Sequence, residues 1–128
     1  FQSKMVRYTF GKKEKLCSKL VIEKLFKTGK GFKEYPFRVV YLPLELSDST
    51  AKLLISVPKK KFKKAVARNK IKRMVREAYR LNKPELIENW TAHGKYFALA
   101  FVYIGNDIPE YADLTKNMQR ILETLKSV

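Results

Sequence analysis

The stretch KYFALAFVYIG (95–105) is almost entirely apolar and is bounded by Gly94 and Gly105. It is shorter than the ~18 apolar residues that a membrane-spanning helix needs. A strand buried on both faces has this pattern, because every one of its side chains meets apolar neighbours. A chain that contains such a strand has to cover both faces of one sheet. We therefore expect a sheet with helices packed on it.

The segments on either side supply the other elements of this fold. A helix is expected over 18–28, with Ser18 as its N-cap and Gly29 or Gly31 as its end. FRVVYLP (37–43) and KLLISV (52–57) are typical of strands, and we expect them to pair as a hairpin. Two further helices are expected, over 64–82 and over 114–125, and a short helical turn is expected over 84–90. The predicted class is α+β, a single mixed sheet with packed helices in the order α-β-β-α-β-α.

Length and composition suit one domain. The chain has 128 residues, of which 45% are hydrophobic. Residues 1–3 match the end of a protease-cleavable tag site, so the expected domain is 4–128, beginning with a basic, extended arm over 4–15. We see no secretory leader, and the one cysteine cannot form an internal disulfide. These features predict a cytoplasmic protein.

The charge is large and unevenly distributed. The formal net charge is +16, and residues 1–80 hold 23 basic and 6 acidic residues, a net of +17. Residues 81–128 hold 5 basic and 6 acidic residues, a net of −1. A field of one sign costs self-repulsion and is typical of proteins that bind a polyanion. Nucleic acid is the first candidate, because no lipidation signal or interfacial helix supports a membrane.

The helix expected over 64–82 separates its residues by type. On a helical wheel one side carries an apolar stripe, made of Ala67, Ile71, Met74, Val75 and Ala78. The adjoining side carries cations and an asparagine, namely Arg68, Asn69, Lys72, Arg73, Arg76 and Arg80. An ordinary solvated face would be interspersed with acids, but here only Glu77 is available, four residues after Arg73. This pattern predicts a surface that binds phosphates.

Catalysis by the protein alone is poorly supported. GKGFK (29–33) lacks the spacing of a phosphate-binding P-loop, and His93 has no evident catalytic partner. Acidic residues do not cluster as a metal site would require. We expect no catalytic residue and no bound metal.

Aromatic residues near the basic region are a second signal for nucleic acid. Exposed rings beside lysine and arginine can stack on unpaired bases. Ile22 and Phe26 are expected in an exposed cleft, because Val21 and Leu25 already supply a packing face. Phe37 and Tyr41 fit this cleft and the core equally well.

The segment SVPKKKFKKAVARNKIKRMVRE (56–77) resembles the protein component of bacterial ribonuclease P. The family's basic helix is matched by Arg68, Asn69, Lys72, Arg73 and Arg76, with Lys70 where arginine is usual. The likeness extends to LCSKLVIEKLFKTGKGF (16–32) and to the apolar strand, and spans most of residues 8–126. The resemblance implies a left-handed βαβ crossover carrying the basic helix, as in ribosomal protein S5 domain 2-like folds. That hand opposes the usual rule.

The resemblance also implies a function. In this family a catalytic RNA holds Mg²⁺ at its active site and cleaves precursor tRNA, while the protein binds that RNA and the single-stranded 5′ leader. No cofactor of the protein's own, no membrane and no further protein partner is implied. Carried over by position, the RNA-binding helix comprises Arg68, Asn69, Lys70, Lys72, Arg73, Arg76 and Arg80. The leader-binding cleft comprises Ile22, Phe26, Phe37, Val40, Tyr41, Lys59, Lys60, Lys61 and Lys64.

Our leading hypothesis is a non-catalytic, RNA-binding subunit of the endoribonuclease that removes the 5′ leader from precursor tRNA. A ribosomal protein or a general RNA chaperone is the alternative, because its size and charge would be similar.

Overall fold

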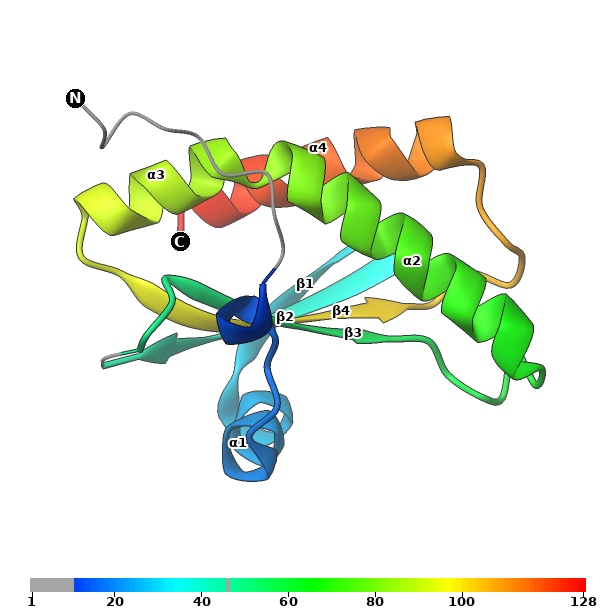
Figure 1. The fold of residues 1–128 in the computed structure, drawn as a ribbon, viewed down its shortest axis with the longest axis horizontal. Coiled ribbons are helices and arrows are strands. Elements are labelled where there is room, and N and C mark those ends of the chain that lie inside the picture. Colours follow the sequence, from blue (N-terminus) through cyan, green and yellow to red (C-terminus); the bar gives the residue numbers. More distant parts are fainter. Residues whose placement is uncertain (1–10, 46) are drawn as a thin grey trace.

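The computed structural model describes residues 11–45 and 47–128 (Figure 1). The tag match at 1–3 and most of the expected arm lie outside these residues. The described chain opens with a 3-10 turn, η2 (Lys12–Glu14). Its helices are α1 (Lys19–Thr28), α2 (Ala65–Asn82), α3 (Pro84–Ala92) and α4 (Tyr111–Lys126). Its strands are β1 (Lys30–Glu34), β2 (Phe37–Leu44), β3 (Ala51–Ser56) and β4 (Tyr96–Tyr103).

The apolar run forms β4, an interior strand of the sheet. The strands of the described residues are ordered β1-β2-β4-β3, and β4 pairs antiparallel with β2 and parallel with β3. The five residues from Phe97 to Phe101 are all buried. The prediction of a strand covered on both faces is confirmed, and so is the single mixed sheet.

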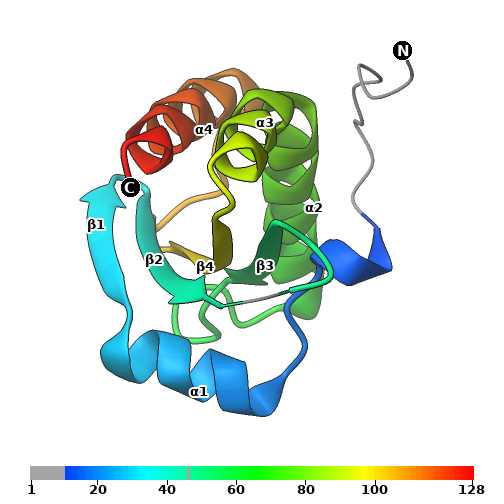
Figure 2. The ribbon, with the colours of Figure 1, turned by 90° about the vertical axis from the view of Figure 1, so that its left-hand side faces the viewer.

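Helices cover the sheet unequally (Figures 1 and 2). α2, α3 and α4 lie on one face, over a large core that includes Phe37, Phe101 and Trp90. α1 lies alone on the other face, where Leu25 joins a smaller cluster of Leu16, Val40, Leu42, Ala98 and Ala100. We call these the three-helix face and the α1 face. A single ten-residue helix is ~15 Å long, so it leaves part of its face uncovered.

The crossover from β3 to β4 runs through α2 and α3 on the three-helix face. Figure 2 looks along the strands, with β3 and β4 running away from the viewer. In that view the chain passes from β3 up through the helices and down into β4 counter-clockwise, so the crossover is left-handed. The hand implied by the resemblance is confirmed.

One expectation about the strands was wrong, and one strand was missed. β2 and β3 do not form a hairpin, because β4 inserts between them. The hairpin is instead β1–β2, in which Glu34 pairs with Phe37 across a tight turn. β1 (KGFKE) escaped prediction because it is an edge strand with little apolar alternation. Alternation identifies a strand but carries no information about its partner.

The ends of α1 follow the expected rules. The hydroxyl of Ser18 accepts a hydrogen bond from the backbone N–H of Val21 at 3.4 Å, and Gly29 is the C-cap. The expected turn over 84–90 is the longer helix α3, which begins at Pro84. None of the helices in the described residues is long and apolar enough to span a membrane.

Candidate nucleic-acid interface

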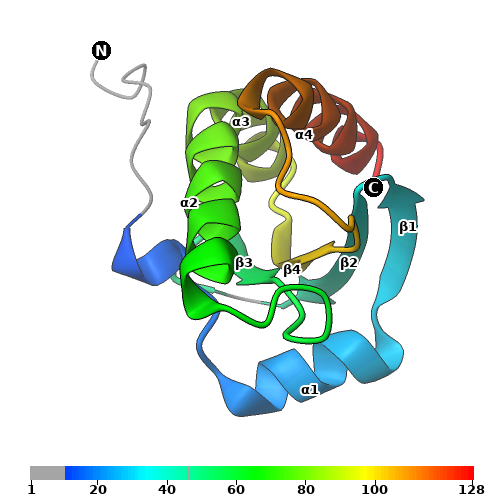
Figure 3. The same cartoon turned by 90° about the vertical axis from the view of Figure 1, so that its right-hand side faces the viewer.

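α2 is held by its apolar stripe, which leaves its cationic side in solvent. Ile71, Val75, Ala78 and Tyr79 are buried, and Ala67 and Met74 pack against the same core. The predicted core stripe is confirmed, with Tyr79 added to it. Figure 3 shows α2 at the edge of the helical layer, beside β3, so one flank of the helix has no neighbouring helix.

The outward side of α2 is mainly cationic, and its one acid, Glu77, is paired with Arg80. We call Asn69, Lys72, Arg73 and Arg76 the cationic face; all are exposed except Lys72, which is half-buried. Lys70 is exposed on the neighbouring flank. Among the described residues no carboxylate pairs with any of these cations. Their positive charge is therefore available to an external anion.

Arg80 differs from the other predicted cations because Glu77 is bound to it. The Arg80 Nε donates to Glu77 at 3.2 Å and its Nη2 at 2.5 Å. These hydrogen bonds lower the pKa of Glu77, so the carboxylate stays charged. The i,i+4 pair expected between Arg73 and Glu77 is replaced by this i,i+3 pair. Arg73 thereby keeps its charge unopposed, whereas Arg80 is partly neutralised.

Arg68 closes the loop that precedes α2. Its Nη1 donates to the carbonyl oxygens of Phe62 and Lys63, at 2.8 and 2.9 Å. The N-cap residue, Lys64, makes no side-chain hydrogen bond to the helix, so the hydrogen bonds of Arg68 are what join this end of α2 to the loop. The side chain therefore has a structural role, because these two hydrogen bonds join the helix to the preceding loop.

Arg68→Ala is expected to lower the free energy of unfolding by about 1–2 kcal/mol, because two hydrogen bonds from a charged donor are lost at a half-exposed site. Arg68→Lys should rescue little, since one ammonium cannot reproduce the fork. Urea denaturation measures both. Arg73→Ala is the matched control and should stay within ~0.5 kcal/mol of the parent protein. Equal losses at both positions would contradict a structural role specific to Arg68.

The α1 face of the sheet has an uncovered end. Strand register aligns Lys33, Arg38, Val102 and Ser56 across the four strands, and we call these four residues the open row. Lys33 and Arg38 are exposed, and Val102 and Ser56 are half-exposed. The next row contains Val40 and Ala100, which α1 covers. The open row thus combines two cations with an apolar centre.

The α1 residues predicted for the cleft lie on this side of the molecule. Ile22 is half-buried and packs against the cluster that contains Val40. Phe26, one turn later, is 47% exposed. The expectation that Phe26 is exposed agrees with this placement.

The sheet residues predicted for the cleft are corrected by the structure. Phe37 is fully buried on the three-helix face, with its ring centroid 5.6 Å from that of Tyr103. Tyr41 points to the same face and contacts Phe97 at 6.1 Å between centroids. Val40 is on the α1 face but only 4% exposed. Adjacent strand residues point to opposite faces, so Val40 and Tyr41 could never share one surface.

Sequence reasoning missed the two cations of the open row. Arg38 alternates with core residues in β2, which was the available signal for an outward charge on this strand. Lys33 was missed because β1 itself was missed. Both residues are exposed on the α1 face of the sheet.

A lysine-rich loop lies between the open row and α2. The four lysines assigned by resemblance to the leader-binding cleft, Lys59, Lys60, Lys61 and Lys64, are exposed. The Nζ of Lys61 donates to the carbonyl oxygen of Ile104 at 2.6 Å, which ties the loop to the end of β4. The loop follows β3 and precedes α2, so along the chain its lysines lie between the open row and the cationic face.

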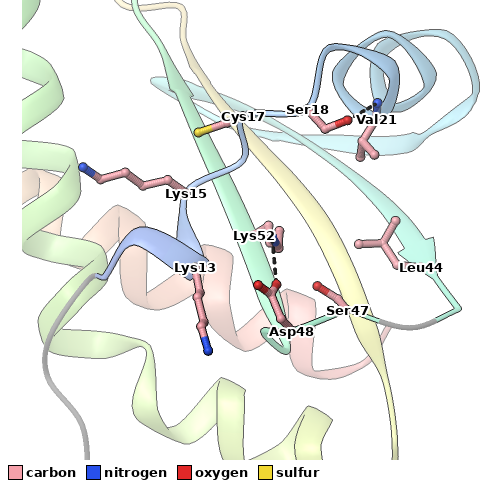
Figure 4. Close-up of a pocket in the computed structure, with 9 residues that line it drawn as sticks. All are labelled: Lys13, Lys15, Cys17, Ser18, Val21, Leu44, Ser47, Asp48 and Lys52. Atoms are coloured by element: carbon pink, nitrogen blue, oxygen red, sulfur yellow. Dashed lines mark hydrogen bonds and ion pairs between the residues drawn. The ribbon is translucent and has the colours of Figure 1, made fainter.

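A hollow of about 460 Å³ lies at the other end of α1 (Figure 4). Lys13, Lys15 and Lys52 line it together with Ser18, and Lys52 pairs with Asp48 at 2.8 Å. Across the described residues, no group of three or more His, Cys, Asp or Glu side chains could hold a metal ion.

Comparison with known proteins identifies the family. The family model for ribonuclease P matches residues 10–126. A relative from Porphyromonas gingivalis, the "Ribonuclease P protein component", is 41% identical over 117 residues, covering 89% of this chain and 85% of its own. The chain belongs to the ribonuclease P protein family.

Other members of the ribonuclease P protein family share the fold. A component from Chlorobium phaeobacteroides is 28% identical over 126 residues, covering 90% of this chain and 86% of its own. The solved ribonuclease P protein of Thermotoga maritima is 26% identical with a TM-score of 0.68, covering 90% of this chain and 97% of its own. The Staphylococcus aureus protein, 21% identical with a TM-score of 0.64, supports the fold; it covers 87% of this chain and 94% of its own. Membership makes this chain a protein component of ribonuclease P, a tRNA-processing ribonucleoprotein, and implies ribonuclease P RNA as its partner.

Proposed function

We propose that the protein binds the catalytic ribonuclease P RNA through the cationic face of α2 and the 5′ leader of precursor tRNA through the open row and Phe26. The protein itself contributes no catalytic group. The observation that carries this proposal is the cationic face, where Arg73 and Arg76 lie exposed on a rigid helix without an acidic partner. A general solubility surface would mix charges of both signs.

The cationic face acts on the RNA backbone. Arg73 and Arg76 are three residues apart, which places them on neighbouring turns at roughly 5–6 Å. Each guanidinium can hold two phosphate oxygens at once. Asn69 adds a donor and an acceptor within the same field. Binding here positions the protein on a folded RNA without reading its sequence.

The open row suits a single strand that leaves the tRNA. Lys33 and Arg38 would neutralise successive phosphates, while Val102 and the ring of Phe26 offer apolar contact to bases. Stacking on a ring is tolerant of sequence, because every base has a π-face. This arrangement favours an extended leader over a paired one.

The chemical step belongs to the RNA in this proposal. Mg²⁺ held by the RNA would supply the chemistry of the cut, activation of water and stabilisation of the leaving oxygen, and no residue of this chain would hold the ion. The protein lowers the phosphate repulsion between catalytic RNA and substrate, so that both substrate and Mg²⁺ bind at lower Mg²⁺ concentration. The proposed setting is the cytoplasm, and no second protein is required.

Cleavage of precursor tRNA at low Mg²⁺ tests the function. We expect ribonuclease P RNA to cleave slowly alone and much faster when this protein is added. A ribosomal protein or general RNA chaperone would give at most a small effect, equal for unrelated ribozymes. Absence of selective stimulation would overturn the proposal.

Phe26→Ala is expected to weaken binding of precursor tRNA with a long leader by about 1–3 kcal/mol, or roughly 5–100-fold, because one stacking platform is lost. Mature tRNA, which lacks the leader, should be unaffected. Tyr111→Ala is the matched control, since it removes an aromatic ring that is 39% exposed on α4, which lies on the three-helix face. Titration of the assembled holoenzyme with both RNAs measures the difference. An equal loss of affinity for precursor tRNA and mature tRNA would show that Phe26 does not bind the leader.

A further inference from the structure

The segment before α1 is attached to the edge of the sheet. The backbone N–H of Leu16 donates to the carbonyl oxygen of Leu53 at 3.0 Å, and Lys15 forms a parallel bridge with the same residue. Leu16 is 5% exposed and anchors this attachment in the smaller core. Lys15 is therefore held at a defined position beside β3, the strand next to α2.

An ion pair ties the same segment to the far end of α2. The Nζ of Lys83, the C-cap residue of α2, donates to Oε1 of Glu14. Lys83 is 3% exposed, so its charge is neutralised inside the protein. The other oxygen of Glu14 accepts from the N–H of Gly11 at 2.9 Å, which closes the η2 turn. Glu14 thus holds the turn and the helix at once.

Between these two attachments lies a second hollow, of about 230 Å³. It is lined by Lys15, Arg73, Arg76, Glu77 and Arg80. Figure 4 shows the side chain of Lys15 directed toward α2, away from Lys13. Glu77 is bound by Arg80, and among the described residues no carboxylate pairs with Lys15, Arg73 or Arg76. Three cations without an ion pair, from two separate parts of the chain, therefore line one small space together with the Arg80–Glu77 pair.

We propose that Lys15, Arg73 and Arg76 bind one backbone phosphate of ribonuclease P RNA, and that Glu14 and Lys83 are positioning residues for this pocket. Cations this close repel one another, so their convergence requires a tether and is relieved by an anion. Glu14 supplies the tether, and Lys83 cancels its negative charge beside the phosphate. The inference rests on the proposed function, because it names the contact within the same RNA-binding surface.

The first test is the coupling between Lys15 and Arg73. Affinity for a bacterial ribonuclease P RNA is measured over a salt series. Lys15→Ala should lower the affinity about tenfold, because one of the three cations around the shared phosphate is lost. The salt slope should change by less than the ~0.7–0.9 of a whole phosphate contact, because Arg73 and Arg76 still hold that phosphate. In an Arg73→Ala background the same substitution should cost clearly less, because the shared phosphate is already weakly held. Lys13→Ala removes the same charge two residues earlier and should be additive with Arg73→Ala.

The second test separates positioning from charge. Glu14→Gln raises the net charge by one, so electrostatics alone predicts tighter RNA binding. Loss of positioning predicts binding weaker by several-fold, with Lys15→Ala costing little more in that background. Because Glu14→Gln leaves a buried ammonium unpaired, the double variant Glu14→Gln/Lys83→Met keeps the net charge and should show the same weakening. Circular dichroism of each variant verifies folding.

The outcomes distinguish the inference from the function beneath it. If the parent protein binds ribonuclease P RNA no better than an unrelated RNA of equal length, the proposed function fails. If it binds selectively but Lys15→Ala is as additive as Lys13→Ala, or the Glu14→Gln/Lys83→Met variant binds as tightly as the parent, the pocket alone is refuted. Inorganic phosphate is the last arm. Competition only at millimolar concentration supports an RNA phosphate, whereas saturation of the hollow at micromolar phosphate would make it a small-anion site.

Discussion

Phe37→Ala is expected to lower the free energy of unfolding by about 3–5 kcal/mol and the melting temperature by roughly 10 °C or more, which is the cost of deleting a large ring from a packed core. Phe37 is fully buried, and its ring makes edge contacts with Phe101 and Tyr103 at 6.3 and 5.6 Å between centroids. The side chain has no surface to offer a leader. Differential scanning calorimetry and urea denaturation measure the loss.

The control is the same substitution at the exposed phenylalanine. Phe26→Ala removes an identical ring that is 47% exposed, so it should cost less than ~1 kcal/mol in stability. At a temperature where both variants are folded, only Phe26→Ala should change the preference for long leaders. If Phe37→Ala were as stable as the parent protein but bound the leader more weakly, Phe37 would be a leader-binding residue after all.

The sequence predicts well those elements that are recognisable from a local pattern of residues. β4 is recognisable because burial on both faces demands an unbroken apolar run. α2 is recognisable because its apolar residues recur with the helical period, and α1 because Ser18 and Gly29 match the chemistry of helix ends. The partners of each strand depend on the whole chain. The insertion of β4 between β2 and β3 is therefore absent from any local pattern.

The same distinction applies to the candidate site. Exposed cations on α2 follow from the wheel, yet the commitment of Arg68 and Arg80 to partners inside the protein does not. Arg68 binds carbonyls of the preceding loop, and Arg80 binds Glu77. Which face of the sheet is uncovered depends on how far α1 reaches across it. Alternation along β2 already separates Arg38 and Val40 from Tyr41, but it does not show which of the two faces stays open.

Replacing both Arg73 and Arg76 by alanine is expected to have the largest effect on RNA binding. In the inferred pocket the two arginines share one phosphate, so losing both should reduce the slope of log K against log salt by about 0.7–0.9. At low salt the affinity for ribonuclease P RNA should fall by about 3 kcal/mol, roughly 100-fold. Both residues are exposed and unpaired with any acid in the described residues, so the protein should remain as stable as the parent.

The matched control removes the same two units of charge elsewhere. Lys116→Glu alters an exposed residue of α4, outside the lysine- and arginine-rich surface, and lowers the net charge by two. If the long-range field of the protein sets the affinity, both variants should lose the same slope, because they have the same net charge. If Arg73 and Arg76 contact phosphates, only their removal should flatten the salt dependence. Equal slopes for the two variants would mean that α2 attracts RNA through its overall positive charge and that Arg73 and Arg76 do not contact phosphates.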